Sequence, residues 1–153
     1  MKKEVAILIK DLKALNFSKA KYFILKLKQE LSPKDLKEII YLTSDEENGV
    51  GILTYTFLIE FFVDDDNQLI WNEVARDILA NNLCHLKFAY SAALIHAKKV
   101  CELDRTNIAA WELFLDIGAN RSKILDDKSI NYIALRILEL DPSNSKGRIY
   151  LNK

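Results

Sequence analysis

Apolar residues recur at intervals of three and four along almost the whole chain, which is the periodicity of amphipathic helices. The segment 50–63 contains Thr, Tyr and Phe, which suit a strand, but it is long for a strand and no segment of similar composition could pair with it. We therefore expect a helix there too. The pattern predicts helices near residues 4–15, 18–30, 33–42, 50–63, 68–82, 87–103, 107–117, 128–139 and 144–151.

Local signals mark several helix ends. Ser32-Pro33 supplies an N-cap hydroxyl and a proline at the first helical position. Gly118 stands where a helix could end on a left-handed residue. Because the connections are short, successive helices should be antiparallel neighbours. The expected fold is a single all-α domain over residues 1–153, built as an antiparallel helix-hairpin array.

The composition agrees with this fold class. The chain has 153 residues, of which 50% are hydrophobic and 29% charged, with 4 glycines and 2 prolines. So few breakers argue against a sandwich, a barrel or a Rossmann-type protein. The apolar run at residues 5–9 is too short for a signal peptide, and 50–63 is too short to span a bilayer. We expect a cytoplasmic protein with no membrane partner.

The second half of the chain contains an internal repeat. Residues 100–111 (VCELDRTNIAAW) and 137–148 (ILELDPSNSKGR) correspond at an offset of 37. This pattern resembles the tetratricopeptide repeat, in which a small residue lets two helices approach and a Leu-Asp-Pro-x-Asn turn ends the second helix. The resemblance makes Ala93 the small contact residue and Trp111 the start of the next repeat, although Arg105 replaces the turn proline and Leu115 the expected glycine. It implies a repeat region over residues 84–151. The first half of the chain lacks the motif, so it either continues the array or forms a separate small bundle packed on the repeats. Given the length of the chain, we favour one continuous superhelix of eight or nine helices.

No residue pattern points to catalysis or to a metal. His85 and His96 are 11 residues apart, about 16 Å along a helix, so they cannot bind one ion together. Cys84 and Cys101 are 17 apart, beyond disulfide reach on a continuous helix. A phosphate-binding loop and a nucleophile elbow are both missing. We expect no enzyme, no catalytic residue, no cofactor and no metal site.

The formal net charge of zero hides a strong segregation. Residues 1–38 carry ten lysines against five acids, whereas residues 39–79 carry nine acids against Arg76 alone. Solvation and helix capping would explain the acids, but a surface of one sign also speeds association with a partner of the opposite sign. An exposed aromatic beside the acids would form an anchor. The candidate partner-binding residues are Asp45, Glu46, Glu47, Asp64, Asp65, Asp66, Glu73 and Asp77, with Trp71 as the aromatic.

A second resemblance concerns residues 53–58 (LTYTFL), 83–86 (LCHL) and 89–93 (AYSAA). Together they look like small all-helical immunity proteins of bacterial contact-dependent and polymorphic toxin systems. Such proteins bind the toxic C-terminal domain, often a nuclease, of a secreted protein made by the same cell. The resemblance implies a basic toxin domain as partner, whose active site is occluded, and a chain that is a monomer or forms a 1:1 heterodimer without binding nucleic acid.

Two alternatives remain. The first is a general repeat adaptor that holds a peptide in its concave groove, with contacts from Asn81, Asn82, Lys87 and Arg121. The second is a small enzyme or RNA-binding protein that uses the basic N-terminal segment. Its phosphate contacts would come from Lys2, Lys3, Lys10, Lys13, Lys19, Lys21, Lys26 and Lys28. Because these lysines are spread over all helix faces, a solvated surface is the better interpretation.

Overall fold

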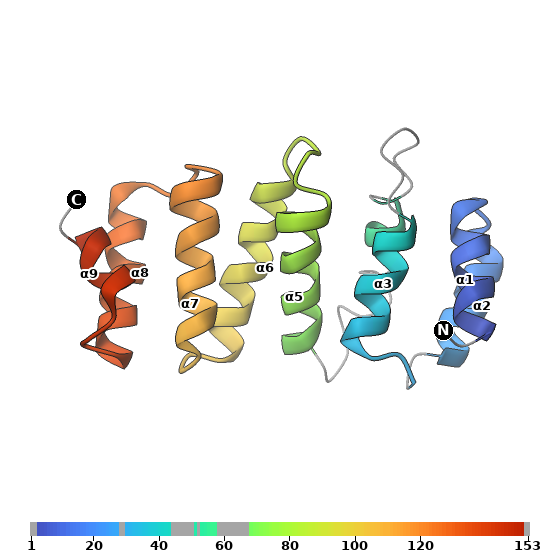
Figure 1. Cartoon of the computed structure of the whole chain (residues 1–153), viewed down its shortest axis with the longest axis horizontal. Helices are drawn as coiled ribbons and strands as arrows, with labels where there is room; N and C mark the ends of the chain where they lie inside the picture. Colours follow the sequence, from blue (N-terminus) through green and yellow to red (C-terminus); the bar gives the residue numbers. More distant parts are fainter. Residues whose placement is uncertain (1–2, 28–29, 44–50, 52, 58–67, 152–153) are drawn as a thin grey trace. The chain divides into compact units, whose positions relative to one another are not determined.

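A computed structural model describes residues 3–27, 30–43, 51, 53–57 and 68–151 of the chain. Within these ranges the structure contains helices and turns and no strand, so the predicted all-α fold is confirmed (Figure 1). The helices are α1 (Lys3–Lys13), α2 (Phe17–Leu27), α3 (Pro33–Thr43), α5 (Gln68–Asp77), η1 (Ile78–Asn82), α6 (Ala89–Leu103), α7 (Ile108–Leu115), η2 (Asp116–Arg121), α8 (Asp127–Leu140) and α9 (Ser145–Leu151).

The chain divides into two compact units, Met1–Val74 and Ala75–Lys153, and the division falls within α5. In the first unit α1 packs against both α2 and α3. Its buried residues Val5, Leu8, Ile9 and Leu12 follow the three-and-four spacing that the sequence shows. Residues 53–57 are helical, as predicted for that part of 50–63, and Phe57 packs its ring 5.1 Å from that of Phe17.

The predicted start of α3 is confirmed by its hydrogen bonds. The Asp35 amide donates to Ser32 Oγ at 3.2 Å, and Asp35 Oδ2 accepts from the Ser32 amide at 2.8 Å. This reciprocal arrangement satisfies two backbone donors that a helix start leaves open. Among the basic N-terminal residues, those within the described ranges are exposed, as a solvated surface requires: Lys3, Lys10, Lys13, Lys19, Lys21 and Lys26.

In the second unit, α6, α7, α8 and α9 run alternately in opposite directions, and each packs on the next (Figure 1). Ala93 and Ala97 are fully buried on α6, where their small side chains allow close packing. The internal repeat is structural as well as sequential. Asn107 and Asn144 each accept a hydrogen bond from the amide three residues on, at 3.1 and 3.0 Å.

The structure corrects the prediction for Gly118. This residue is buried inside η2, a π-helical segment that continues α7, and it is not the left-handed end of a helix. A Cβ atom at Gly118 would lie 2.2 Å from Leu125 Cδ1 and 3.0 Å from Leu94 Cδ1. Glycine is therefore required here by close packing and not by a positive φ.

The helix expected over 87–103 begins later, at Ala89. Phe88 adopts a left-handed conformation with φ 70°, which a continuing right-handed helix cannot include. Cys84 and His85 consequently lie in the turn before α6, and the prediction that they share a helix with Cys101 and His96 was wrong. Both cysteines are free thiols.

Candidate functional site

The second unit carries a short motif twice, at the points where an α-helix widens into a π-helix. Residues 77–81 read Asp-Ile-Leu-Ala-Asn and residues 116–120 read Asp-Ile-Gly-Ala-Asn, at an offset of 39. The first copy runs from the end of α5 into η1, and the second forms most of η2. Because π-helical segments are rare and frequently mark functional sites, this pair of motifs is the candidate site.

In the first copy, the aspartate and the asparagine are already held by neighbours. Asn81 Nδ2 donates to the Asp77 carbonyl at 2.9 Å. Arg76 donates to Asp77 Oδ1 from Nε at 3.0 Å and from Nη2 at 2.8 Å. The Arg76 side chain is 7% exposed and that of Asp77 30%, so this ion pair is partly desolvated. The Asp77 carboxylate is therefore a structural partner of Arg76.

In the second copy, the aspartate collects two donors from its own segment. Asn120 Nδ2 donates to Asp116 Oδ1 at 3.0 Å, and Arg121 Nε donates to Asp116 Oδ2 at 2.9 Å. The hydrogen bond from Asn120, followed by the bond and charge of Arg121, lowers the pKa of the Asp116 carboxyl. Asp116 stays ionised at neutral pH and fixes both neighbours.

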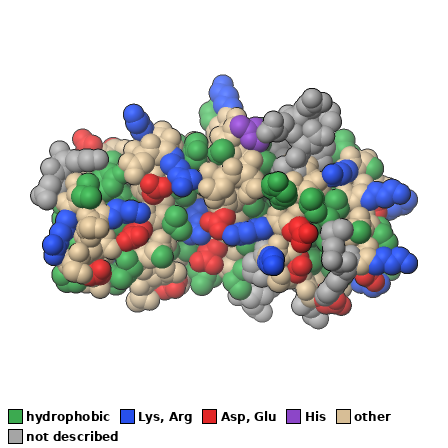
Figure 2. All heavy atoms as spheres, viewed as in Figure 1, with side chains coloured by type: hydrophobic (Ala, Val, Ile, Leu, Met, Phe, Trp, Pro, Cys, Tyr) green, Lys and Arg blue, Asp and Glu red, His purple; other side chains and the backbone are tan. Residues whose placement is uncertain are grey.

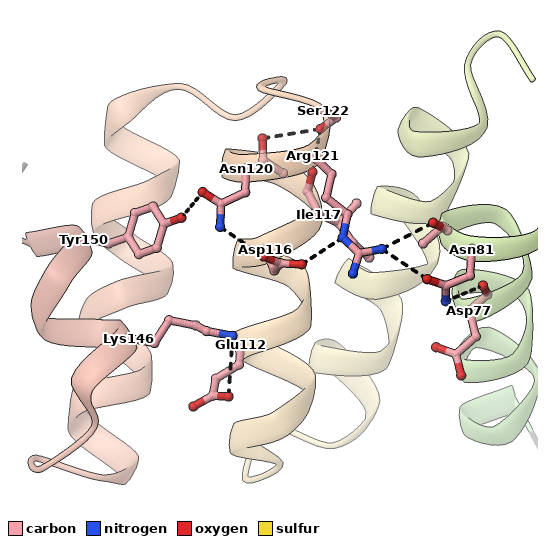
Figure 3. A network of polar contacts seen from close by, with 12 residues as sticks. Asp77, Asn81, Glu112, Asp116, Ile117, Asn120, Arg121, Ser122, Lys146 and Tyr150 are labelled. Carbon is pink, nitrogen blue, oxygen red and sulfur yellow. Dashed lines mark hydrogen bonds and ion pairs between the residues drawn. The ribbon is translucent and has the colours of Figure 1, made fainter. Parts of the chain in front are cut away.

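Arg121 joins the two copies across 40 residues of sequence (Figure 3). Its Nη1 donates to Asn81 Oδ1 at 3.1 Å and to the Ala80 carbonyl at 3.3 Å. At the other end, the Tyr150 hydroxyl donates to Asn120 Oδ1 and brings α9 into the network. We call this chain of contacts the polar ladder; its members are Asp77, Asn81, Asp116, Asn120, Arg121 and Tyr150.

A further set of contacts links α7 to the start of α9. Glu112 Oε1 accepts from Asn144 Nδ2 at 2.7 Å, and Glu112 Oε2 lies 3.7 Å from Lys146 Nζ. Figure 2 shows acidic, basic and apolar side chains intermixed on the side where α7 and α9 are in view. This surface offers hydrogen-bonding groups of both kinds and is not dominated by one charge.

The partner-binding residues predicted in the acidic segment differ in where the structure places them. Asp45, Glu46, Glu47, Asp64, Asp65 and Asp66 lie outside the described residues. Glu73 is half-buried on α5, and Asp77 is bound by Arg76. Trp71 is 7% exposed, so it is a core residue whose ring has little surface that a partner could contact. Of the four adaptor candidates, Asn81 and Arg121 contact each other in the polar ladder, whereas Asn82 and Lys87 are exposed and outside it.

The ladder members that the sequence analysis missed are Asp116, Asn120 and Tyr150. The repeated Asp-Ile-x-Ala-Asn was the available signal, but its two copies are 39 residues apart, whereas the Leu-Asp turns that resemble the tetratricopeptide repeat are 37 residues apart. Nothing in the sequence pattern shows the π-helical geometry, because it depends on how the helix ends pack.

The chemistry of the site is hydrogen bonding. Within the described ranges no group of three or more His, Cys, Asp and Glu could hold a metal ion. Burial raises the pKa of the Cys101 thiol to about 12, so this thiol stays protonated and unreactive. Burial also acts on His96, where it lowers the pKa of the imidazole because it disfavours the charged form.

Comparison with family models, with curated proteins and with solved structures finds no match to this chain. Among the helices that the structure describes, none is long and apolar enough to cross a bilayer.

Proposed function

We propose that this chain is a non-catalytic protein-binding domain whose partner contacts the polar ladder. The observation that carries the proposal is the Arg121 side chain, which bridges two copies of one motif at two helix ends. Holding an arginine side chain at three acceptors costs conformational entropy. This loss favours a binding role for the surface that carries Arg121.

Preorganisation is the physical advantage of such a surface. A side chain that is already fixed loses little rotamer entropy when a partner binds. The Arg121 side chain is 38% exposed, and its Nη2 makes no hydrogen bond to the part of the chain that the structure describes. It can therefore donate to a partner's carbonyl or carboxylate oxygen. Asn81 and Asn120, both exposed, extend the same capacity along the ladder.

The specific role that we propose is that of a cytoplasmic immunity protein, which occludes the active site of a basic toxin domain in a 1:1 complex. Support comes from the concentration of nine acids in residues 39–79, which would attract a basic partner. Asp77 is an unsuitable residue for testing this attraction, because its reversal would leave the buried Arg76 without a partner. Reversal of Asp65, Asp66 and Glu73 avoids that defect.

Two claims are tested by one calorimetric titration: the immunity role and the contact of the partner with the polar ladder. The full chain is titrated with the C-terminal domain encoded immediately upstream of its own gene. We expect nanomolar binding that weakens with salt. In stopped-flow mixing, the combined changes Asp65→Lys, Asp66→Lys and Glu73→Lys should slow association. Arg121→Gln should weaken binding at least about tenfold, whereas Arg148→Gln, an exposed control on α9, should not.

The outcomes distinguish the immunity role from the choice of the polar ladder as the contact surface. Failure of the upstream domain to bind contradicts the immunity role. Tight binding that Arg121→Gln leaves unchanged contradicts the polar ladder as the contact surface.

A further inference from the structure

A groove separate from the polar ladder runs between α6 and α8, with α7 as its floor. It consists of two hollows of about 480 and 540 Å³ that share Tyr132. The first is lined by residues of all three helices and of the turn after α6, among them Cys101, Arg105, Trp111 and Leu135. The second is lined mainly by apolar side chains, Phe114, Leu125 and Ile133 among them. No residue of the groove belongs to the polar ladder.

Large apolar groups are left open to solvent along this groove. Tyr132 is 63% exposed and Leu135 50%, although both point from α8 into the hollows. The Tyr132 ring stands edge-on to Trp111, with centroids 6.4 Å apart. Trp111 is fixed in turn, because its Nε1 donates to the Arg105 carbonyl at 3.1 Å. A rigid aromatic floor with exposed apolar walls is the type of surface that receives apolar side chains of a partner.

The charges around the groove identify the kind of partner. Four cations line it, Lys98, Arg105, Lys128 and Arg136, against the two carboxylates of Glu102 and Glu139. Both carboxylates are already occupied. Glu139 accepts from Arg136 at 2.6 Å, and Glu102 lies within 4.0 Å of Lys98 and Lys99.

Two cations therefore remain available at opposite ends of the groove. None of the ion pairs in the described ranges includes Arg105 or Lys128, although Lys128 is close enough to the Asp126 carboxylate to act on it electrostatically. The nearby carboxylate of Asp126 caps α8 by accepting from the Ser129 amide at 2.8 Å. A partner that places carboxylates at both ends of an apolar stripe would match this distribution.

We propose that the α6–α8 groove binds an acidic amphipathic helix of a partner protein. Ser129 in one hollow and Arg136 in the other are seven residues apart on α8, which corresponds to about 10 Å along the helix. Residues i and i+7 of a bound helix have the same separation, so two apolar side chains of one helix face can enter the two hollows. This inference goes beyond the proposed function, since it concerns a different surface and a partner of opposite charge.

The test uses the full chain and a fluorescein-labelled synthetic helix with leucines at i, i+3, i+4 and i+7 and glutamates on both flanks. Fluorescence anisotropy should show saturable binding, at least about tenfold tighter than for the same peptide with lysines in place of the glutamates. The double variant Arg105→Glu/Lys128→Glu should weaken binding at least about tenfold. The control Lys3→Glu/Lys19→Glu, which makes the same change of charge at exposed positions of α1 and α2 outside the groove, should leave it unchanged.

A second pair of variants, one in the groove and one outside it, tests the apolar contacts. Leu135→Ala should weaken binding about fivefold or more, whereas Ile149→Ala, on a similarly exposed residue of α9, should have no effect. Absence of saturable binding, equal affinity for the acidic and basic peptides, or equal effects of groove and control variants would overturn the proposal. Arg121→Gln should leave peptide binding intact, which keeps this test independent of the polar ladder.

Discussion

Gly118 provides the sharpest test of the packing that places η2. Alanine is preferred over glycine inside a helix by about 1 kcal/mol, so intrinsic propensity alone predicts that Gly118→Ala stabilises the protein. The structure predicts the opposite sign. The new Cβ would lie 2.2 Å from Leu125 Cδ1 and 2.5 Å from Leu125 Cγ, more than 1 Å inside ordinary contact distance. Overpacking of this kind costs about 1–3 kcal/mol. After the propensity gain of about 1 kcal/mol is subtracted, we expect a net loss of about 1 kcal/mol in the free energy of unfolding.

Urea denaturation followed by circular dichroism measures this loss directly, provided that the slope with urea is unchanged. Leu125→Ala serves as the second arm of a double-mutant cycle, because it removes the atoms that clash. In that background Gly118→Ala should be neutral or stabilising, so the coupling free energy should equal the relieved overpacking cost of about 1–3 kcal/mol. A stabilising effect in the wild-type background, or the same loss in both backgrounds, would refute the packing argument.

Three further predictions concern hydrogen bonds of the second unit. Asn107→Ala removes the side chain that caps α7 and should lower the free energy of unfolding by about 1 kcal/mol in urea denaturation. Tyr150→Phe should cost about 1 kcal/mol in the same assay, because the bond to Asn120 is lost, and an unchanged value would show that this bond contributes nothing. The pKa of Asp116 is lowered in the folded state, so its stabilising contribution is complete above its usual value of 3.8 and is lost as the pH falls through the lower folded value. The stability difference between wild type and Asp116→Asn should therefore shrink as the pH falls below 3.8, as measured by unfolding at a series of pH values. A pH-independent difference would contradict the interactions of the carboxylate with Asn120 and Arg121.

Much of the fold follows from the sequence because helix periodicity and capping act locally. The three-and-four spacing of Val5, Leu8 and Leu12 and the Ser32 cap each fix an element without knowledge of the rest of the chain. The turn residues Asn107 and Asn144 have the same role in both copies of the repeat, which their shared position in the sequence anticipates.

The remaining features depend on tertiary contacts. The role of Gly118 is set by Leu125 and Leu94, which the sequence does not place beside it. The contact between Arg121 and Asn81 spans 40 residues, and it becomes visible only once η1 and η2 are adjacent to α6. Asp77 was predicted to bind a partner from the charge pattern alone, but in the structure its carboxylate forms an ion pair with Arg76.

Hydrogen–deuterium exchange of the full chain, with and without the upstream-encoded toxin domain, tests most directly whether a partner contacts the polar ladder. The expected result is that complex formation slows exchange at the amides of residues 77–82 and 116–121, where both copies of the motif lie, and that Arg121→Gln reduces this protection. Protection confined to α1 and α2, with unchanged exchange in η1 and η2, would contradict it.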